Sequence, residues 1–173
     1  MGVRTYIDSG VLIAAIRGDQ TIAAAARSYL YDPLRDYISS DYVKVEVLPS
    51  CIFQGNQDEK DFYDDFFRRT ITRVPSDDAL LQLAINEGSA TGVSGLDAVH
   101  VACARVGGAV DLITSEKVTK PIHRAAGINV ISINPERAAR SELQRSAIAL
   151  GRASKSFAIA ILRSIKKALR LGS

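Results

Sequence analysis

Short apolar segments alternate with helix-forming segments along the first 133 residues, and this alternation constrains the fold more than any other feature. The expected strands span residues 4–7, 36–39, 71–74, 110–114 and 129–133. A helix-forming segment separates each strand from the next. Strands joined through helices pair in parallel and are covered by helices on both faces. The pattern predicts an α/β protein, a three-layer α/β/α sandwich with a central parallel sheet.

The helices expected between these strands span residues 10–17, 21–31, 42–48, 56–69, 77–88, 94–106 and 121–126. Ser40 or Asp41 is positioned to cap the third helix, because both residue types accept hydrogen bonds from exposed amides. We expect that helix to end before Pro49, which lacks the amide hydrogen needed to continue it.

Composition excludes several classes of protein. Hydrophobic residues make up 47% of the chain and charged residues 24%, which is typical of a folded domain. Cys51 and Cys103 are far apart and have no metal-site spacing, so we expect two reduced, buried thiols. No apolar run is long enough for a transmembrane helix, and Asp8 interrupts the segment where a secretion signal needs an apolar centre. These features predict a cytoplasmic protein.

Charge divides the chain into two parts. Residues 1–136 contain 13 basic and 18 acidic residues, a net charge of −5, whereas residues 137–173 contain 9 basic and 1 acidic residue, a net charge of +8. We therefore distinguish a body, residues 1–135, from a basic tail, residues 136–173.

Four acidic residues are candidates for a functional site. Asp8 and Glu116 follow the first and fourth expected strands, and ligands of open parallel sheets bind where strands end. Glu46 and Asp97 lie in expected helices between apolar neighbours, where a charge needs compensation, most simply by a cation. Each also has a simpler interpretation. Asp8 can cap a helix, Glu46 can face solvent, Asp97 can form a capping box with Ser94, and Glu116 can be a loop acid.

The segments around these acids resemble the PIN domain family, most closely its small VapC-type toxins. The matching segments are YIDSGVLIAA (6–15), SSDYVKVEVL (39–48), GLDAVHVACA (95–104) and DLITSEK (111–117). Their order and spacing match from about residue 4 to residue 133. Two departures are that Glu116 stands where the family usually has Asp, and that Gly10 stands where relatives often have Asn.

The resemblance implies a metal-dependent endoribonuclease that hydrolyses RNA phosphodiester bonds and leaves a 5′-phosphate and a 3′-hydroxyl. It implies that Asp8, Glu46, Asp97 and Glu116 are catalytic. Asp8, Asp97 and Glu116 are then the metal ligands, and Glu46 is a further ligand or orients the attacking water. Ligands that are all oxygen atoms suit Mg²⁺ or Mn²⁺.

Three further residues lie close to these acids in the sequence. We expect Ser9 and Thr114 to hydrogen-bond to the ligands, with a cap or turn role as the alternative. His100 lies one helical turn beyond Asp97 and so can face the site, but we expect a packed or surface histidine.

By the same resemblance, the chain is the toxin of a type II toxin–antitoxin pair, a homodimer with a small antitoxin as partner. One alternative is a non-catalytic PIN-fold scaffold that binds RNA or protein, which the exchange at Glu116 and the long tail allow. A second is an aspartate-nucleophile phosphatase. That chemistry uses an Asp-x-Asp pair, whereas Asp8 is followed by Ser9 and Gly10.

The basic tail contains two helix-forming segments, residues 137–150 and 157–169. Apolar residues mark one face of the second segment: Phe157, Ile161, Leu162, Ile165 and Leu169. Lysines and arginines lie off this face, which predicts a basic amphipathic helix. Three interpretations remain open: packing on the body or a second subunit, contact with RNA phosphates, and binding to an anionic membrane surface.

Overall fold

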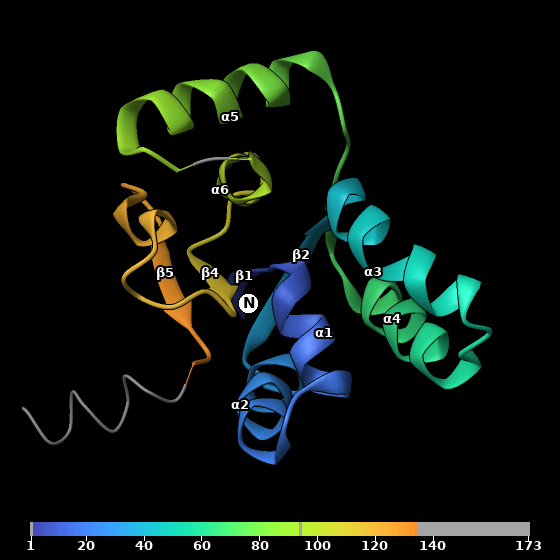
Figure 1. Cartoon of the computed structure of the whole chain (residues 1–173). Helices are drawn as coiled ribbons and strands as arrows, with labels where there is room; N and C mark the ends of the chain where they lie inside the picture. Colours follow the sequence, from blue (N-terminus) through green and yellow to red (C-terminus); the bar gives the residue numbers. More distant parts are fainter. Residues whose placement is uncertain (1, 94, 135–173) are drawn as a thin grey trace, which may run out of the picture. The chain divides into compact units, whose positions relative to one another are not determined.

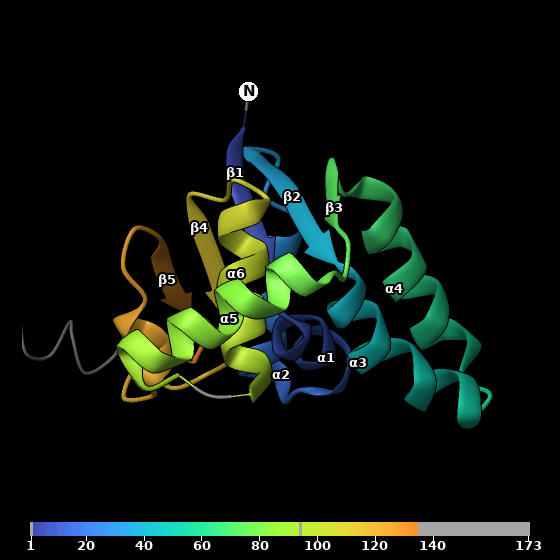
Figure 2. The same ribbon diagram turned by 90° about the horizontal axis from the view of Figure 1, so that it is seen from above.

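The central sheet has five parallel strands in the order β3-β2-β1-β4-β5. The computed structural model describes residues 2–93 and 95–134. The strands are β1 (Val3–Ile7), β2 (Arg35–Ser40), β3 (Thr72–Val74), β4 (Asp111–Thr114) and β5 (Asn129–Ser132). All five predicted strands are confirmed, as is their parallel pairing (Figures 1 and 2). Strands β2 and β3 lie on one side of β1, and β4 and β5 lie on its other side. The strand order therefore reverses between β1 and β4, which are adjacent.

Helices cover both faces of the sheet and complete the predicted three layers. Helices α1 (Ser9–Arg17) and α2 (Gln20–Leu30) lie on one face (Figure 1). Helix α6 (Gly95–Val106) lies on the other face, with α5 (Asp78–Thr91) packed outside it. Helices α3 (Asp41–Phe53) and α4 (Gln57–Arg69) form a pair beside α1. A short 3₁₀ helix, η1 (Pro121–Arg124), precedes β5.

The core lies between the sheet and these helices. Its largest fully buried side chains include Tyr6, Tyr63, Phe66, Ile7 and Leu12. Both cysteines are free and buried, as predicted. None of the helices in the part of the chain that the structure describes is long and apolar enough to cross a membrane.

Helix α3 continues four residues beyond Pro49, so the predicted end at that proline was wrong. Pro49 has no amide hydrogen to donate to the carbonyl of Val45, so only this one helical hydrogen bond is lost. Val45 is 70% exposed, so water can bind that carbonyl. Cys51 lies beyond the proline and is fully buried, so packing of the last turn offsets the lost hydrogen bond. The predicted cap is confirmed, because Ser40 accepts a hydrogen bond from the amide of Val43.

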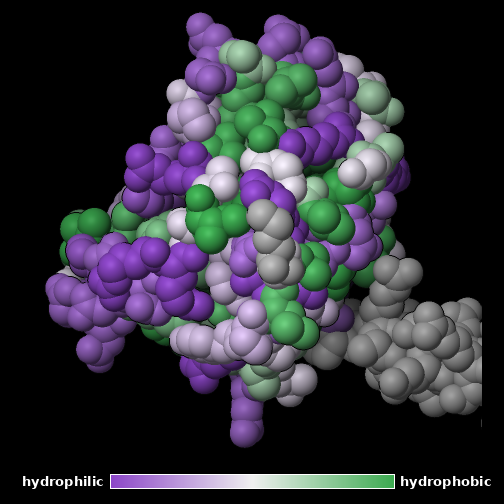
Figure 3. Space-filling model, turned by 180° about the vertical axis from the view of Figure 1, so that it is seen from behind, coloured by the Kyte–Doolittle hydropathy of each residue, from purple (hydrophilic) through white to green (hydrophobic). Residues whose placement is uncertain are grey.

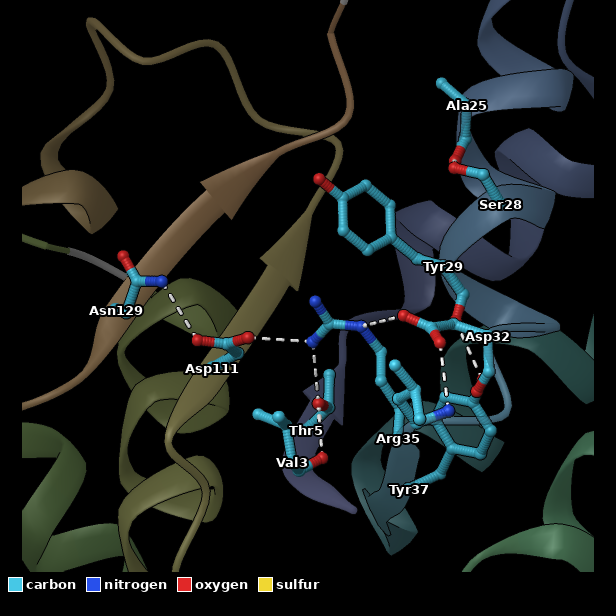
Figure 4. A network of polar contacts seen from close by, with 11 residues as sticks. Val3, Thr5, Ala25, Ser28, Tyr29, Asp32, Arg35, Tyr37, Asp111 and Asn129 are labelled. Carbon is cyan, nitrogen blue, oxygen red and sulfur yellow. Dashed lines mark hydrogen bonds and ion pairs between the residues drawn. The ribbon is translucent and has the colours of Figure 1, made fainter.

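The amino-terminal edge of the sheet is closed by an ion-pair network (Figure 4). Asp111, at the start of β4, is buried and pairs with Arg35 at 2.7 Å. Arg35 also contacts Asp32 at 3.1 Å and the hydroxyl of Thr5 at 2.9 Å, and the amide of Asn129 donates to Asp111. This acid is therefore neutralised by the protein itself, far from the strand ends where Asp8 and Glu116 lie.

Apolar residues are exposed near the starts of several strands. Val3, Leu34, Ile71 and Val110 are 41–71% exposed. Figure 3 views the molecule from behind and shows apolar patches among hydrophilic residues on that face. The basic tail, with its predicted helices and its boundary at residue 135, lies outside the described residues.

Candidate active site at the carboxyl edge of the sheet

The register of β1 and β4 determines where the first candidate acid lies. Ile7 pairs with Ile113, so the two strands end side by side. The amide of Asp8 donates to the carbonyl of Ile113 at 3.1 Å, which ties the residue after β1 to the end of β4. This edge, where the strands end, is called the carboxyl edge below. The reversal of strand order between β1 and β4 makes it the usual ligand-binding position in such sheets.

Asp8 is buried, with 5% of its surface exposed. Its carboxylate accepts a hydrogen bond from the amide of Gly10 and so caps α1, as its simpler interpretation required. Burial raises the pKa of Asp8, and the opposing effects of His100, Thr114 and Gly10 only partly offset this. Burial therefore makes the ionised form of Asp8 unfavourable in free energy, and a nearby cation would stabilise it.

The loop that follows β4 lies so close to Gly10 that it leaves little room for a side chain there. A Cβ atom at this position would lie 2.1 Å from the Oγ of Ser115 and 3.0 Å from an oxygen of Asp8. Ser115 occupies the space that a side chain at position 10 would need. This close approach gives a physical reason for the departure from the Asn that relatives often have.

Glu46 projects from α3 and is half-buried. Its Oε2 lies 2.9 Å from Nε2 of His100 on α6, and the hydroxyl of Ser9 also acts to lower the pKa of Glu46. Burial raises the pKa of Glu46, but the hydrogen bond and positive charge of His100 outweigh this, so the net shift is downward. By strict hydrogen-bond geometry Oε2 accepts no bond among the described residues, so the contact with His100 is defined by distance and charge. This buried oxygen retains capacity for a further donor or a cation.

Asp97 lies in the first turn of α6 and is half-buried. Burial raises its pKa, the charge of Glu116 raises it further, and His100 and Lys120 act in the opposite direction. Glu116 follows β4 in a loop that is fixed at both ends. Its amide donates to Thr114 Oγ1 at 3.0 Å, and its carbonyl accepts from Ser132 at 2.7 Å. Ser94, the residue that would complete the capping box with Asp97, lies outside the described residues.

The structure places all four predicted acids at the carboxyl edge. Their charges act on one another in three pairs: Asp8 with Glu46, Glu46 with Asp97, and Asp97 with Glu116. Within residues 2–93 and 95–134, however, no three acidic, histidine or cysteine side chains form a group that could hold a metal ion. The donor chemistry, carboxylate oxygens with one underused buried oxygen, fits a hard divalent cation.

The two predicted supporting residues also lie at this site. Ser9 acts to lower the pKa of Glu46, and Thr114 acts to lower the pKa of Asp8 while accepting a hydrogen bond from the amide of Glu116.

His100 is a site residue that the sequence offered as an alternative but did not favour. It is buried, as a packed histidine would be, but its partner is Glu46. Burial lowers the pKa of His100, whereas Glu46, Asp8 and Asp97 raise it and prevail. The available signal was its position three residues beyond Asp97, on the same side of the helix.

Comparison with known proteins identifies relatives of this fold. The family model described as the PIN domain matches residues 5–128. The structure of VapBC2 from Rickettsia felis, bound to a DNA fragment from their promoter, is similar, with 10% identity and a TM-score of 0.55. A toxin–antitoxin complex from Klebsiella pneumoniae is similar too, with 18% identity and a TM-score of 0.55. Each comparison covers 75% of this chain and 98% of the other. No curated protein matches the sequence.

Proposed function

Because the chain belongs to the PIN domain family, we propose that it is a metal-dependent endoribonuclease and the toxin of a type II toxin–antitoxin pair. The observation that carries this proposal is the presence of four carboxylates at the carboxyl edge whose charges act on one another in pairs: Asp8 after β1, Glu46 on α3, Asp97 on α6 and Glu116 in the loop after β4. These acids interact electrostatically, and uncompensated like charges oppose one another. A bound cation would relieve that repulsion.

In this proposal Asp8, Asp97 and Glu116 hold Mg²⁺ or Mn²⁺, and Glu46 is a further ligand or orients the attacking water. A divalent cation at this position would lower the pKa of a bound water and neutralise charge on the scissile phosphate. The pKa of Glu46 is lowered, so its carboxylate is ionised near neutral pH and can accept a hydrogen bond that orients a water molecule. Ser9 and Thr114 hold Glu46 and Asp8 in orientation.

The proposed partners are an RNA substrate, a second copy of the chain and a small antitoxin. The antitoxin is supported by the similar structures from Rickettsia felis and Klebsiella pneumoniae, whose descriptions name VapBC2 and a toxin–antitoxin complex. A non-catalytic scaffold is the second candidate. It is favoured by one observation, that no three potential ligands converge within the described ranges.

RNA cleavage by the purified full chain with Mg²⁺ or Mn²⁺ tests the proposal. We expect cleavage by the wild type, and we expect Asp8→Asn and Asp97→Asn to reduce it to the level measured with a chelator. Asp58→Asn is the control, because Asp58 is an exposed acid on α4, away from the carboxyl edge. Undiminished cleavage by both site variants would contradict the assignment, and absence of cleavage by the folded wild type would favour the scaffold.

A further inference from the structure

A chain of buried polar contacts leads from the cap of α3 to Glu46 on the same helix. The hydroxyl of Tyr6, in β1, lies 2.8 Å from Oγ of Ser40 and 2.9 Å from Nδ1 of His100. Nε2 on the other side of the imidazole lies 2.9 Å from Oε2 of Glu46. Ser40 and Tyr6 are fully buried, and His100 is 3% exposed. This series of polar contacts therefore joins β1, α3 and α6 inside the protein.

The proton positions along this chain follow from the chemistry of its members. An ionised carboxylate only accepts hydrogen bonds, so the proton between His100 and Glu46 belongs to Nε2. This holds whether the ring is neutral or charged. The hydroxyls of Tyr6 and Ser40 can each donate or accept, so they can satisfy Nδ1 in both forms of the ring. Tyr6 and Ser40 thus allow Nε2 to keep its proton beside Glu46, 2.9 Å from Oε2, in both forms of the ring.

The three connected elements are the ones that present the site. Residue Asp8 directly follows β1, Glu46 lies on α3, and Asp97 lies on α6, one turn before His100. A glutamate on a helix surface has several rotatable bonds, and catalytic groups need to be held by packed neighbours. A fixed imidazole at 2.9 Å restricts the Glu46 carboxylate to one side of its helix.

We propose that His100 is a positioning residue, which directs the carboxylate of Glu46 toward the other site acids, and that Tyr6 and Ser40 anchor its ring. This inference rests on the proposed function, because the orientation of Glu46 matters for cleavage only if Glu46 takes part in it. It assigns a role to three residues that contact no substrate.

Two substitutions of His100 distinguish a role in orienting Glu46 from a role in packing alone. The amide nitrogen of glutamine can occupy the place of Nε2, so His100→Gln retains a donor for Glu46. The shorter side chain of asparagine reaches only the place of Nδ1, so His100→Asn retains the contact with Tyr6 and loses Glu46. We expect His100→Asn to lower kcat about 10- to 100-fold with little change in KM, and His100→Gln to recover most of that loss. Equal kcat values in the two folded variants would overturn the inference.

Tyr63 provides a matched control for the anchoring residue Tyr6. Tyr63 is fully buried and donates to a glutamate, Glu59, at 2.6 Å, on α4 rather than at the carboxyl edge. Tyr6→Phe and Tyr63→Phe each remove one buried hydroxyl. We expect both to lower the thermal unfolding temperature, but only Tyr6→Phe to lower kcat. Equal kcat values in the wild type and a folded Tyr6→Phe variant would contradict the anchoring role.

A spectroscopic measurement tests the contact without cleavage. The side-chain carboxyl carbon of Glu46 can be observed by NMR in the metal-free full chain and assigned by its absence in Glu46→Gln. We expect His100→Asn to shift this resonance and His100→Gln to shift it less, and an unchanged resonance in both would overturn the inference. The proposed function fails separately, by undiminished cleavage in Asp8→Asn and Asp97→Asn. If those variants are inactive while His100→Asn cleaves like the wild type, only the inference fails.

Discussion

Asp8 illustrates how a single buried residue couples stability to pH. Burial raises its pKa, so over the pH range between its ordinary and its raised pKa the native state holds a proton that the unfolded state has released. The contribution to stability is complete below the ordinary pKa and is lost as pH rises through the raised one. Asp97 acts in the same direction, and Glu46, whose pKa is lowered, acts in the opposite direction.

The substitution Asp8→Asn isolates this effect. Asparagine caps helices as well as aspartate does, so α1 keeps its cap while the buried charge is removed. In the presence of a chelator at neutral pH, we expect the variant to unfold at a temperature a few degrees higher than the wild type, for a gain of about 1 kcal/mol. We also expect a shallower dependence of its unfolding temperature on pH.

Thermal unfolding followed by circular dichroism between pH 4 and pH 8 measures both quantities, with Asp58→Asn as the control for loss of an exposed acid. Asp8→Asn should also lose the stabilisation that Mn²⁺ gives the wild type. A lower unfolding temperature than that of the metal-free wild type across the whole range would show that burial of this charge is not unfavourable.

At the scale of residues, the four acids could be predicted from their places in the pattern, but their surroundings could not. Apolar neighbours in the sequence were expected to bury Glu46 and Asp97. In the structure Val45 and Leu96 are 70% and 44% exposed, because adjacent helical residues point about 100° apart. The surroundings of Glu46 come from Ser9 and His100 on other helices, and no local pattern reports such long-range pairs.

At the scale of elements, strands and caps were predictable and one helix end was not. The five strands and their parallel pairing followed from apolar segments separated by helices, and Ser40 was a correct cap because capping depends on local chemistry. The continuation of α3 through Pro49 depends on tertiary packing, since it requires Cys51 to be buried and Val45 to be exposed. Local propensity alone therefore ended this helix too early.

The proline in α3 gives a prediction at this scale. Pro49 is exposed, and Pro49→Ala would restore the amide that the carbonyl of Val45 lacks. We expect the free energy of unfolding to rise by about 1–3 kcal/mol, since proline is disfavoured by about 3 kcal/mol within a helix. Urea denaturation measures the change. An equal or lower midpoint in the variant would mean that α3 has already adapted to the proline.

At the scale of the whole molecule, the unequal distribution of charge along the chain bears on the proposed cleavage of RNA. Residues 1–136 carry a net charge of −5 and the segment after them carries +8. An acidic surface repels RNA except where a cation or basic side chains intervene. Of the three interpretations of the basic tail, contact with RNA phosphates would offset this repulsion, and it competes with packing on the body or a second subunit and with membrane binding.

Salt dependence tests the contact with RNA phosphates. RNA binding is measured with Asp97→Asn, which should bind without cleaving, and with the same protein carrying four serines in the tail, in place of Arg163, Lys166, Lys167 and Arg170. If all four contact phosphates, the slope of log affinity against log salt concentration should become shallower by about 3. An unchanged slope would favour packing on the body, and vesicle binding that depends on these four residues would favour the membrane surface.

The proposed function depends on the four acids at the carboxyl edge forming one divalent-cation site. Anomalous diffraction from crystals of the full chain soaked in Mn²⁺ tests it directly. We expect a manganese peak at that edge, bonded to carboxylate oxygens of Asp8, Asp97 and Glu116. A well-ordered carboxyl edge with no manganese peak, or a peak that none of these carboxylates contacts, would contradict it.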